Sequence, residues 1–293
     1  MAASPSINPE IYFFPLGPLG WRPLLIKKEN LMLYMTPFIT AYCIFLAALT
    51  GSCMGSFLNC MAWRIVHGES VTKGRSHCDE CGHVLGPADL VPVFSYLIHK
   101  GKCRYCGASL SKRHLIAEVL SAVVFVSILL KFNISLQALK YMIFACILLA
   151  ASFADLEGYI IPDRFIASGI VIYAAFLPFA GNPKAECIDG LIGGFAVATA
   201  VLLNVLAFEK IKKVEAMGGG DIKLLFLTGL FLGWKLNLLC LLFACFIGII
   251  FGLAFSAGKE EKTFPWGPSI ALAAWLCLLV GNELVTWYLG LLF

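Results

Sequence analysis

Residues 138–163 read ALKYMIFACILLAASFADLEGYIIPD. The run 138–154 is apolar apart from Lys140 and Ser152, and Asp155 follows it directly. A helix of this length approaches the roughly 20 residues needed to cross a bilayer. An aspartate inside or at the edge of such a helix costs about 2.5–3.5 kcal/mol on insertion scales, so Asp155 is a candidate functional residue.

Apolar runs of similar length occur along most of the chain. Of its 293 residues, 60% are hydrophobic and only 14% are charged, and the mean hydropathy is +0.86. An ordinary soluble domain carries roughly 25% charged residues. This composition excludes soluble, disordered, collagen-like and coiled-coil classes, and nothing in it indicates binding to nucleic acid. It predicts an all-α polytopic membrane protein in contact with lipid.

The apolar runs divide the chain into four parts. We expect an N-terminal surface segment at 1–36, a first transmembrane helix at 37–63, a polar insert at 64–114 and a helical membrane domain at 115–293. Seven further runs in that domain bring the total to about eight transmembrane helices: 115–131, 138–154, 164–181, 188–208, 222–234, 236–257 and 268–292. The run 222–234 is the weakest, because as a helix it rises only about 20 Å.

Charge fixes the orientation. Alternating crossings place about twice as many lysines and arginines on the side of the insert as on the other side, which by the positive-inside rule makes the insert cytoplasmic. We therefore expect the N-terminus outside.

Four cysteines of the insert have the spacing of a metal site. Cys78 and Cys81 form one CxxC pair, and Cys103 and Cys106 form another 21 residues later. Paired thiolates at such spacing predict a structural zinc ion with a closed tetrahedral shell. Free thiols or two disulfides are the alternatives, and His77 or His83 could substitute as a ligand.

Three aspartates lie at helix edges. Asp155 and Asp163 flank a break at Ile161-Pro162, and Asp221 follows Gly218-Gly219-Gly220. Two predicted spans separate Asp155 from Asp221, so both fall on the cytoplasmic face. Two neighbouring carboxylates can share one proton, with one activating water and the other protonating a leaving amine. Asp163 and Asp221 could instead only cap helices.

These motifs, taken in order, resemble the bacterial type IV prepilin peptidases, the leader peptidases and N-methyltransferases of pilus and type II secretion systems, which belong with the GxGD aspartyl proteases. The resemblance extends from about residue 51 to 268. It rests on Gly55-Ser-Phe-Leu-Asn59, the cysteine insert with Asp89-Leu-Val-Pro92, Ser111-Lys-Arg113, Glu118, Asp155 with Ile161-Pro-Asp163, Gly218-Gly-Gly-Asp221-Ile-Lys223 and Phe264-Pro-Trp-Gly-Pro268.

The resemblance implies that Asp155 and Asp221 are the catalytic pair of an intramembrane aspartyl endopeptidase. It implies cleavage of the basic leader of prepilins or pseudopilins at the cytoplasmic face of the bacterial inner membrane. It also implies methylation of the new amino terminus with S-adenosylmethionine, for which the sequence shows no binding residues. Zn²⁺ is expected on the four cysteines. Supporting roles are expected for Gly218, Gly220, Lys223, Asp163 and Glu118.

Two other functions fit the same residues. Intramembrane acids also mark proton or ion pathways, so a proton- or ion-coupled transporter is an alternative, although no internal repeat supports it. A non-catalytic membrane scaffold that carries zinc is another. The sequence indicates neither the particular substrate nor an oligomeric state.

Overall fold

The computed structural model describes residues 12–14, 22–24, 37–71, 74–78, 80–213, 217–256 and 264–292. The expected surface segment 1–36 lies outside these residues, apart from two short strands. These strands are β1 (Tyr12–Phe14) and β2 (Arg22–Leu24), which pair antiparallel.

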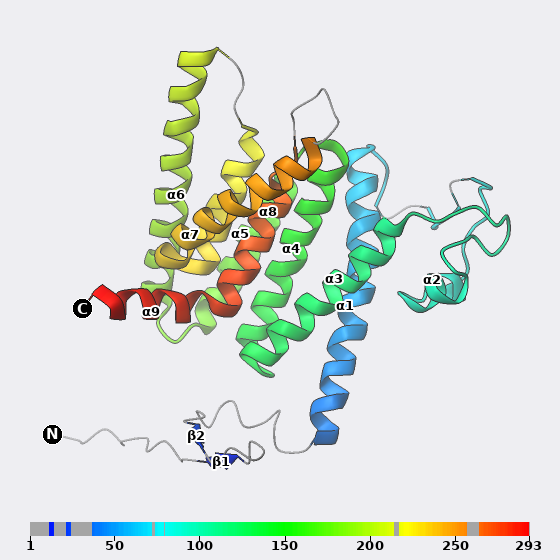
Figure 1. The fold of residues 1–293 in the computed structure, drawn as a ribbon, viewed down its shortest axis with the longest axis horizontal. Helices are drawn as coiled ribbons and strands as arrows, with labels where there is room; N and C mark the ends of the chain where they lie inside the picture. Colours follow the sequence, from blue (N-terminus) through cyan, green and yellow to red (C-terminus); the bar gives the residue numbers. More distant parts are fainter. Residues whose placement is uncertain are drawn as a thin grey trace.

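Helices make up most of the remaining described chain, which confirms the predicted all-α class. The helices are α1 (Pro37–Val66), η3 (Pro87–Leu90), α2 (Phe94–Ile98), α3 (Lys112–Phe132), α4 (Leu136–Gly158), α5 (Asp163–Phe176), η4 (Leu177–Phe179), α6 (Pro183–Lys212), α7 (Gly219–Ser256), α8 (Gly267–Leu276), η5 (Cys277–Gly281) and α9 (Asn282–Leu292). The cysteine insert occupies the connection between α1 and α3, with α2 inside it (Figure 1).

Among the described residues, six helices are long and apolar enough to cross a membrane. All eight predicted apolar runs are nevertheless helical. The count is six rather than eight because α5 has only 14 residues and because α7 contains two of the predicted runs. The protein is a multi-pass membrane protein.

The chain reverses inside α7. Gly233 has φ 74° and ψ 176°, which is not a helical conformation. The Asn237 amide donates to the Leu225 carbonyl at 3.1 Å, although twelve residues of straight helix would separate these groups by about 18 Å. The Thr228 hydroxyl also donates to Asn237 Oδ1 at 2.8 Å. The runs 222–234 and 236–257 are therefore two separate arms, 219–232 and 234–256.

Close packing holds the first arm of α7 inside the bundle. A Cβ on Gly229 would overlap the backbone of Gly193 and Gly194 in α6, so these two helices meet backbone to backbone. On the other side, the Phe231 ring stacks on Phe144 of α4 at a centroid distance of 4.0 Å. Small residues at such contacts are typical of helix association in membranes, where burial of apolar surface gives little driving force.

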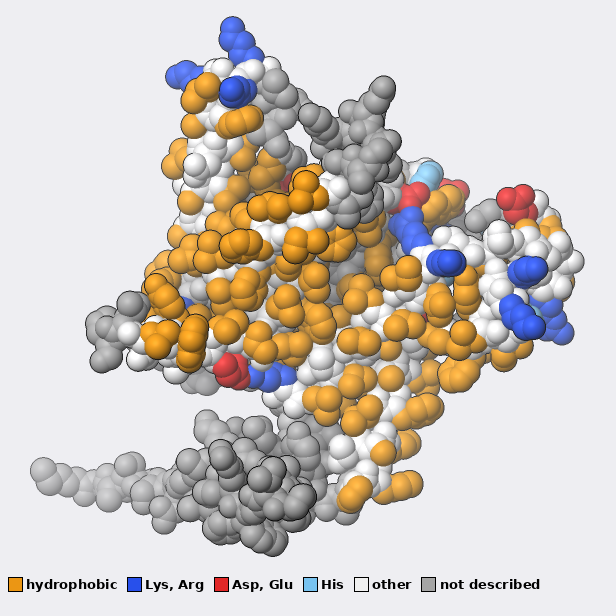
Figure 2. All heavy atoms as spheres, in the orientation of Figure 1, with side chains coloured by type: hydrophobic (Ala, Val, Ile, Leu, Met, Phe, Trp, Pro, Cys, Tyr) orange, Lys and Arg blue, Asp and Glu red, His pale blue; other side chains and the backbone are white. Residues whose placement is uncertain are grey.

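Figure 1 shows that the end of α4, the start of α7 and the start of α8 lie at one end of the bundle. The ends of α1 and α6 lie at the same end. Hydrophobic side chains cover the visible face of the bundle in Figure 2, whereas lysines and arginines gather at the end of α6 and on the insert. This distribution is typical of a helical membrane protein, with the basic side chains near one end of the bundle.

Candidate active site and metal centre

Asp155 lies in the last turn of α4. The helix ends because Tyr159 takes a left-handed conformation (φ 54°, ψ 30°), and the Tyr159 N–H donates to the Asp155 carbonyl at 2.9 Å. Asp155 itself is only 5% exposed. Its carboxylate is therefore buried at the end of the bundle that carries the basic residues.

The start of α8 supplies a hydrogen-bond donor to this carboxylate. The Gly267 N–H donates to Asp155 Oδ2 at 2.8 Å. A Cβ on Gly267 would lie 2.8 Å from the same oxygen, so a side chain cannot be placed there without moving the carboxylate. Trp266 fixes the approach, because its indole N–H donates to the Ala244 carbonyl at 3.1 Å.

Asp221 lies in the first turn of α7, and its N–H donates to the Gly218 carbonyl at 3.2 Å. A Cβ on Gly220 would lie 3.0 Å from Ile161 Cβ, so this glycine lets α7 approach the connection between α4 and α5. Asp221 Oδ1 is buried without a hydrogen-bond partner. Asp155 and Asp221 are close enough for their charges to repel each other. The structure thus brings together the two acids that the sequence placed on one face.

The other expected supporting residues separate into two groups. Lys223 donates to Asp163 Oδ1 at 2.6 Å and joins the starts of α5 and α7. Their side chains are 52% and 74% exposed, so this ion pair contributes little to stability. Glu118 lies elsewhere: it is buried in α3 and accepts the Val93 N–H at 2.7 Å. Glu118 therefore anchors the insert to the membrane domain.

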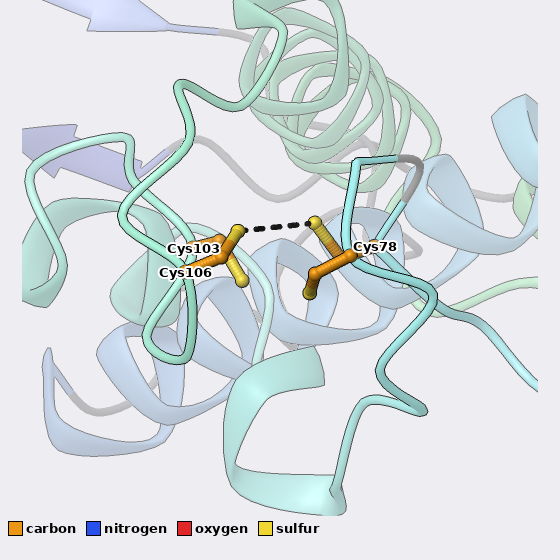
Figure 3. A group of neighbouring side chains, drawn as sticks. Cys78, Cys103 and Cys106 are labelled. Atoms are coloured by element: carbon orange, nitrogen blue, oxygen red, sulfur yellow. Dashed lines mark hydrogen bonds between the residues drawn. The ribbon is translucent and has the colours of Figure 1, made fainter.

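The four cysteines of the insert converge. The sulfur atoms of Cys78, Cys81, Cys103 and Cys106 all lie within 4.8 Å of one another. Figure 3 shows Cys78 facing Cys103 and Cys106, and the Cys78 and Cys106 Sγ atoms are 3.8 Å apart. A tetrahedral zinc ion with bonds of about 2.3 Å would separate its sulfur ligands by about 3.8 Å. The cluster therefore fits a single zinc-sized ion.

Backbone N–H groups also point at these sulfurs. Those of Cys106 and Tyr105 donate to Cys103 and lower its pKa to about 7. The Ala108 N–H lowers the pKa of Cys106, but burial and the neighbouring thiols outweigh it and raise the pKa to about 12. Metal binding requires thiolates, so a bound cation would displace the protons that these thiols otherwise hold.

Two of the alternatives to a four-cysteine site, disulfide bonds and a histidine ligand, find no support in the described residues. All twelve cysteines are free thiols, and 3.8 Å is far longer than the roughly 2 Å of a disulfide bond. The His83 ring instead packs against the Tyr105 ring in a tilted arrangement, with the ring centroids 3.6 Å apart, and His77 Nδ1 lies 3.3 Å from the Arg75 carbonyl. The described group that could hold a metal consists of the four cysteines alone.

A multi-pass helical bundle with one buried and one half-buried aspartate at one end and a four-cysteine insert defines a class of membrane protein with a paired-aspartate site. Residues 49–132 match the family described as the bacterial peptidase A24 N-terminal domain, and residues 142–253 match the type IV leader peptidase family. The chain belongs to this type IV leader peptidase family.

Three relatives carry the name prepilin leader peptidase/N-methyltransferase. The Bacillus subtilis protein is 31% identical over 82% of this chain and 95% of its own length. The Dichelobacter nodosus protein is 31% identical over 82% and 93%, and the Aeromonas salmonicida protein is 30% identical over 74% and 75%. No solved structure matches the chain. These comparisons do not support the transporter alternative.

Sequence reasoning missed several contacts at this site. Gly267 belongs to a motif of the resemblance, but its hydrogen bond to Asp155 depends on how α8 meets α4. Arg113 and Asn59 also belong to such motifs, and in the structure they bond to each other beside α4. Their signal in the sequence was polar residues at the ends of apolar runs, which does not identify a partner.

Proposed function

We propose that this protein is an intramembrane aspartyl endopeptidase that removes the leader peptide of prepilins or pseudopilins, with Asp155 and Asp221 as the catalytic pair. The observation that carries the proposal is that the buried Asp155 and the half-buried Asp221 lie near each other at one end of the bundle, with the Gly267 N–H on Asp155. Membership of the leader peptidase family and the names of the relatives support the substrate class.

The two acids have different hydrogen-bonding surroundings. Asp155 Oδ2 accepts a backbone N–H, as a carboxylate does, whereas Asp221 Oδ1 has no donor facing it. A carboxyl group that holds the shared proton is itself a donor. We therefore assign Asp155 as the base that activates water and Asp221 as the acid.

The reaction follows from this assignment. Asp155 takes a proton from water as the water oxygen bonds to the scissile carbonyl carbon, and Asp221 gives its proton to the carbonyl oxygen. Asp155 then passes its proton to the amide nitrogen as the C–N bond breaks, and Asp221 recovers the proton of the hydroxyl group. The products are a carboxyl group and a free amine, and the pair again holds one proton.

Methylation of the new amine with S-adenosylmethionine is the second activity that the family and the names of the relatives support. We assign no residue to the methyl donor. We propose a structural zinc ion on the four cysteines, since a closed tetrathiolate shell leaves no position for water. The inner membrane, with the basic end of the bundle in the cytoplasm, is the location that the positive-inside rule favours.

Mass spectrometry of one purified prepilin before and after incubation tests the proposal. Asp155→Asn and Asp221→Asn should each abolish leader loss, because a single carboxyl group cannot act as both base and acid. Asp189→Asn in α6 is the matched control. Asp189 is exposed and lies beside Gly233, where α7 reverses, so it is at the opposite end of the first arm of α7 from Asp221. This variant should cleave the prepilin normally. Full cleavage by either variant of the pair would refute the mechanism.

A further inference from the structure

Arg113 lies where the cysteine insert joins the membrane domain. The second cysteine pair sits in a short hairpin, in which Lys102 bridges Ser109 and the Leu110 N–H donates to the Gly101 carbonyl at 2.8 Å. The next residue, Ser111, caps α3, since its Oγ accepts the Arg113 N–H at 3.2 Å. The first turn of α3 therefore directly continues the metal-site hairpin.

The Arg113 side chain connects three helices. Its Nε donates to Asn59 Oδ1 of α1 at 3.1 Å. Its Nη2 donates to the Phe153 carbonyl of α4 at 3.2 Å, and its Nη1 forms an ion pair with Glu157 of α4. Phe153 and Glu157 lie two residues before and two residues after Asp155. Arg113 thus holds α4 on both sides of the buried acid.

Neighbouring side chains reinforce these contacts. Asn59 Nδ2 lies 3.0 Å from His114 Nδ1, and His67 Nε2 lies 3.7 Å from Glu157. The Arg113 and Glu157 side chains are 33% and 17% exposed, so solvent screens this pair less than a surface pair. A guanidinium presents its five N–H donors in a fixed planar fork, which lets one side chain serve three acceptors in different directions.

We propose that Arg113 is a positioning residue for Asp155, and that it transmits the placement of the cysteine insert to the end of α4. The insert sets the first turn of α3, this turn sets Arg113, and Arg113 fixes the backbone that carries the acid. The activity measurement below rests on the proposed function, whereas the exchange measurement does not.

Kinetics of leader cleavage give the first test. Arg113→Ala should lower kcat about 10- to 100-fold with KM within about twofold, because a small misplacement of a catalytic group carries a cost of this size and substrate binding is untouched. Arg113→Lys should recover only a small part, since one ammonium group cannot reach three acceptors. Lys112→Ala, the adjacent exposed cation on α3, is the matched control and should cleave normally.

Amide hydrogen exchange in micelles gives the second test. Arg113→Ala should speed exchange in residues 153–159 while leaving residues 128–132 at the other end of α3 unchanged. Cys103→Ser alone should speed exchange in residues 153–159. Combined with Arg113→Ala it should add nothing, because Arg113→Ala has already broken the connection between the insert and α4. Arg113→Lys repeats the exchange measurement should Arg113→Ala fail to fold.

The outcomes separate the two proposals. Cleavage by Asp155→Asn would overturn the proposed function without touching the exchange result. If Asp155→Asn is inactive but Arg113→Ala keeps its kcat, the positioning role alone is overturned. Unchanged exchange in residues 153–159 of Arg113→Ala would overturn it in the same way. A lower kcat together with a changed KM and faster exchange across the whole chain would show general unfolding. That result would also overturn the positioning role.

Discussion

The Gly267 N–H and the Asp155 carboxylate, 112 residues apart in sequence, are hydrogen-bonded at 2.8 Å. This contact joins the start of α8 to the end of α4 at the point where α7 brings in Asp221. A backbone donor cannot rotate away as a side chain can, so the orientation of Asp155 is set by the helix framework itself. We therefore expect a substitution at Gly267 to displace the Asp155 carboxylate.

Gly267→Ala should lower kcat for leader cleavage by about 10- to 100-fold. The added Cβ would lie 2.8 Å from Asp155 Oδ2 and 3.3 Å from its Cγ. The following Pro268 has a fixed φ and limits any backbone adjustment. Steady-state kinetics on a purified prepilin measure the effect, with Gly290→Ala as the control, because a Cβ there meets nothing within 4 Å. An unchanged kcat would mean that Asp155 tolerates displacement.

Cys103→Ser should remove bound zinc, because a hydroxyl group does not replace the thiolate of a tetrathiolate shell. Elemental analysis of protein purified in detergent should find about one zinc per chain in the unchanged protein and a large loss in the variant. Cys53→Ser, which changes an exposed cysteine of α1, should keep its metal. Equal zinc in both variants would rule out the four-cysteine site.

Asp89 should give the insert a pH-dependent stability. The Gly86 N–H and the Tyr105 hydroxyl donate to the Asp89 carboxylate and hold its pKa below the ordinary value near 3.8. A carboxyl group with a depressed folded-state pKa adds stability above its unfolded-state pKa, and this stability is lost as the pH falls through the folded-state value. Asp89→Asn should therefore weaken the insert at pH 7.

Amide exchange of residues 86–105 in the Asp89→Asn variant and the unchanged protein, corrected for intrinsic rates, measures this effect. The difference should be largest near neutral pH and should disappear in strong acid, where the aspartate is protonated. Metal release at low pH affects both proteins alike. Glu80→Gln, at an exposed acid of the same insert, is the control. A difference that grows toward acid would contradict the sign of the argument.

Local patterns in the sequence predicted the membrane helices and the metal site. The run that ends at Asp155 is apolar apart from Lys140 and Ser152, and each CxxC pair places two thiols on one short turn. Neither feature depends on distant parts of the chain. The expectation that both acids lie on one face needed only an even number of crossings between them. The resemblance added the order of the motifs.

The remaining contacts depend on tertiary structure. Arg113 reaches Asn59, 54 residues earlier, and Glu157, 44 residues later. No periodicity in the sequence encodes which carboxylate a guanidinium meets. The sequence likewise gave no sign that Glu118 of α3 would accept the backbone N–H of Val93 in the insert rather than lie at the membrane surface. Such partners follow from helix packing, which the apolar pattern leaves open.

Asn237→Leu should destabilise the bundle by about 1–3 kcal/mol, because it removes the hydrogen bonds that close the reversal of α7. The Asn237 amide donates to the Gly193 carbonyl of α6 at 2.9 Å and its Oδ1 accepts the Thr228 hydroxyl. Leucine has a similar volume but leaves the Gly193 carbonyl buried without this donor. The two arms of α7 would then be joined mainly by apolar contacts, which are weak determinants of helix position in lipid.

Thermal unfolding in detergent measures this loss as a lower Tm. Thr286→Val in α9 is the control, since the Thr286 hydroxyl bonds only to the Asn282 carbonyl of its own helix and is exposed. The first arm of α7 carries Asp221 at its start, so Asn237→Leu should also lower kcat even though Asn237 lies beside the reversal, at the opposite end of that arm. A variant with unchanged Tm and unchanged kcat would show that Gly233 and the glycine contacts with α6 suffice to hold the two arms together.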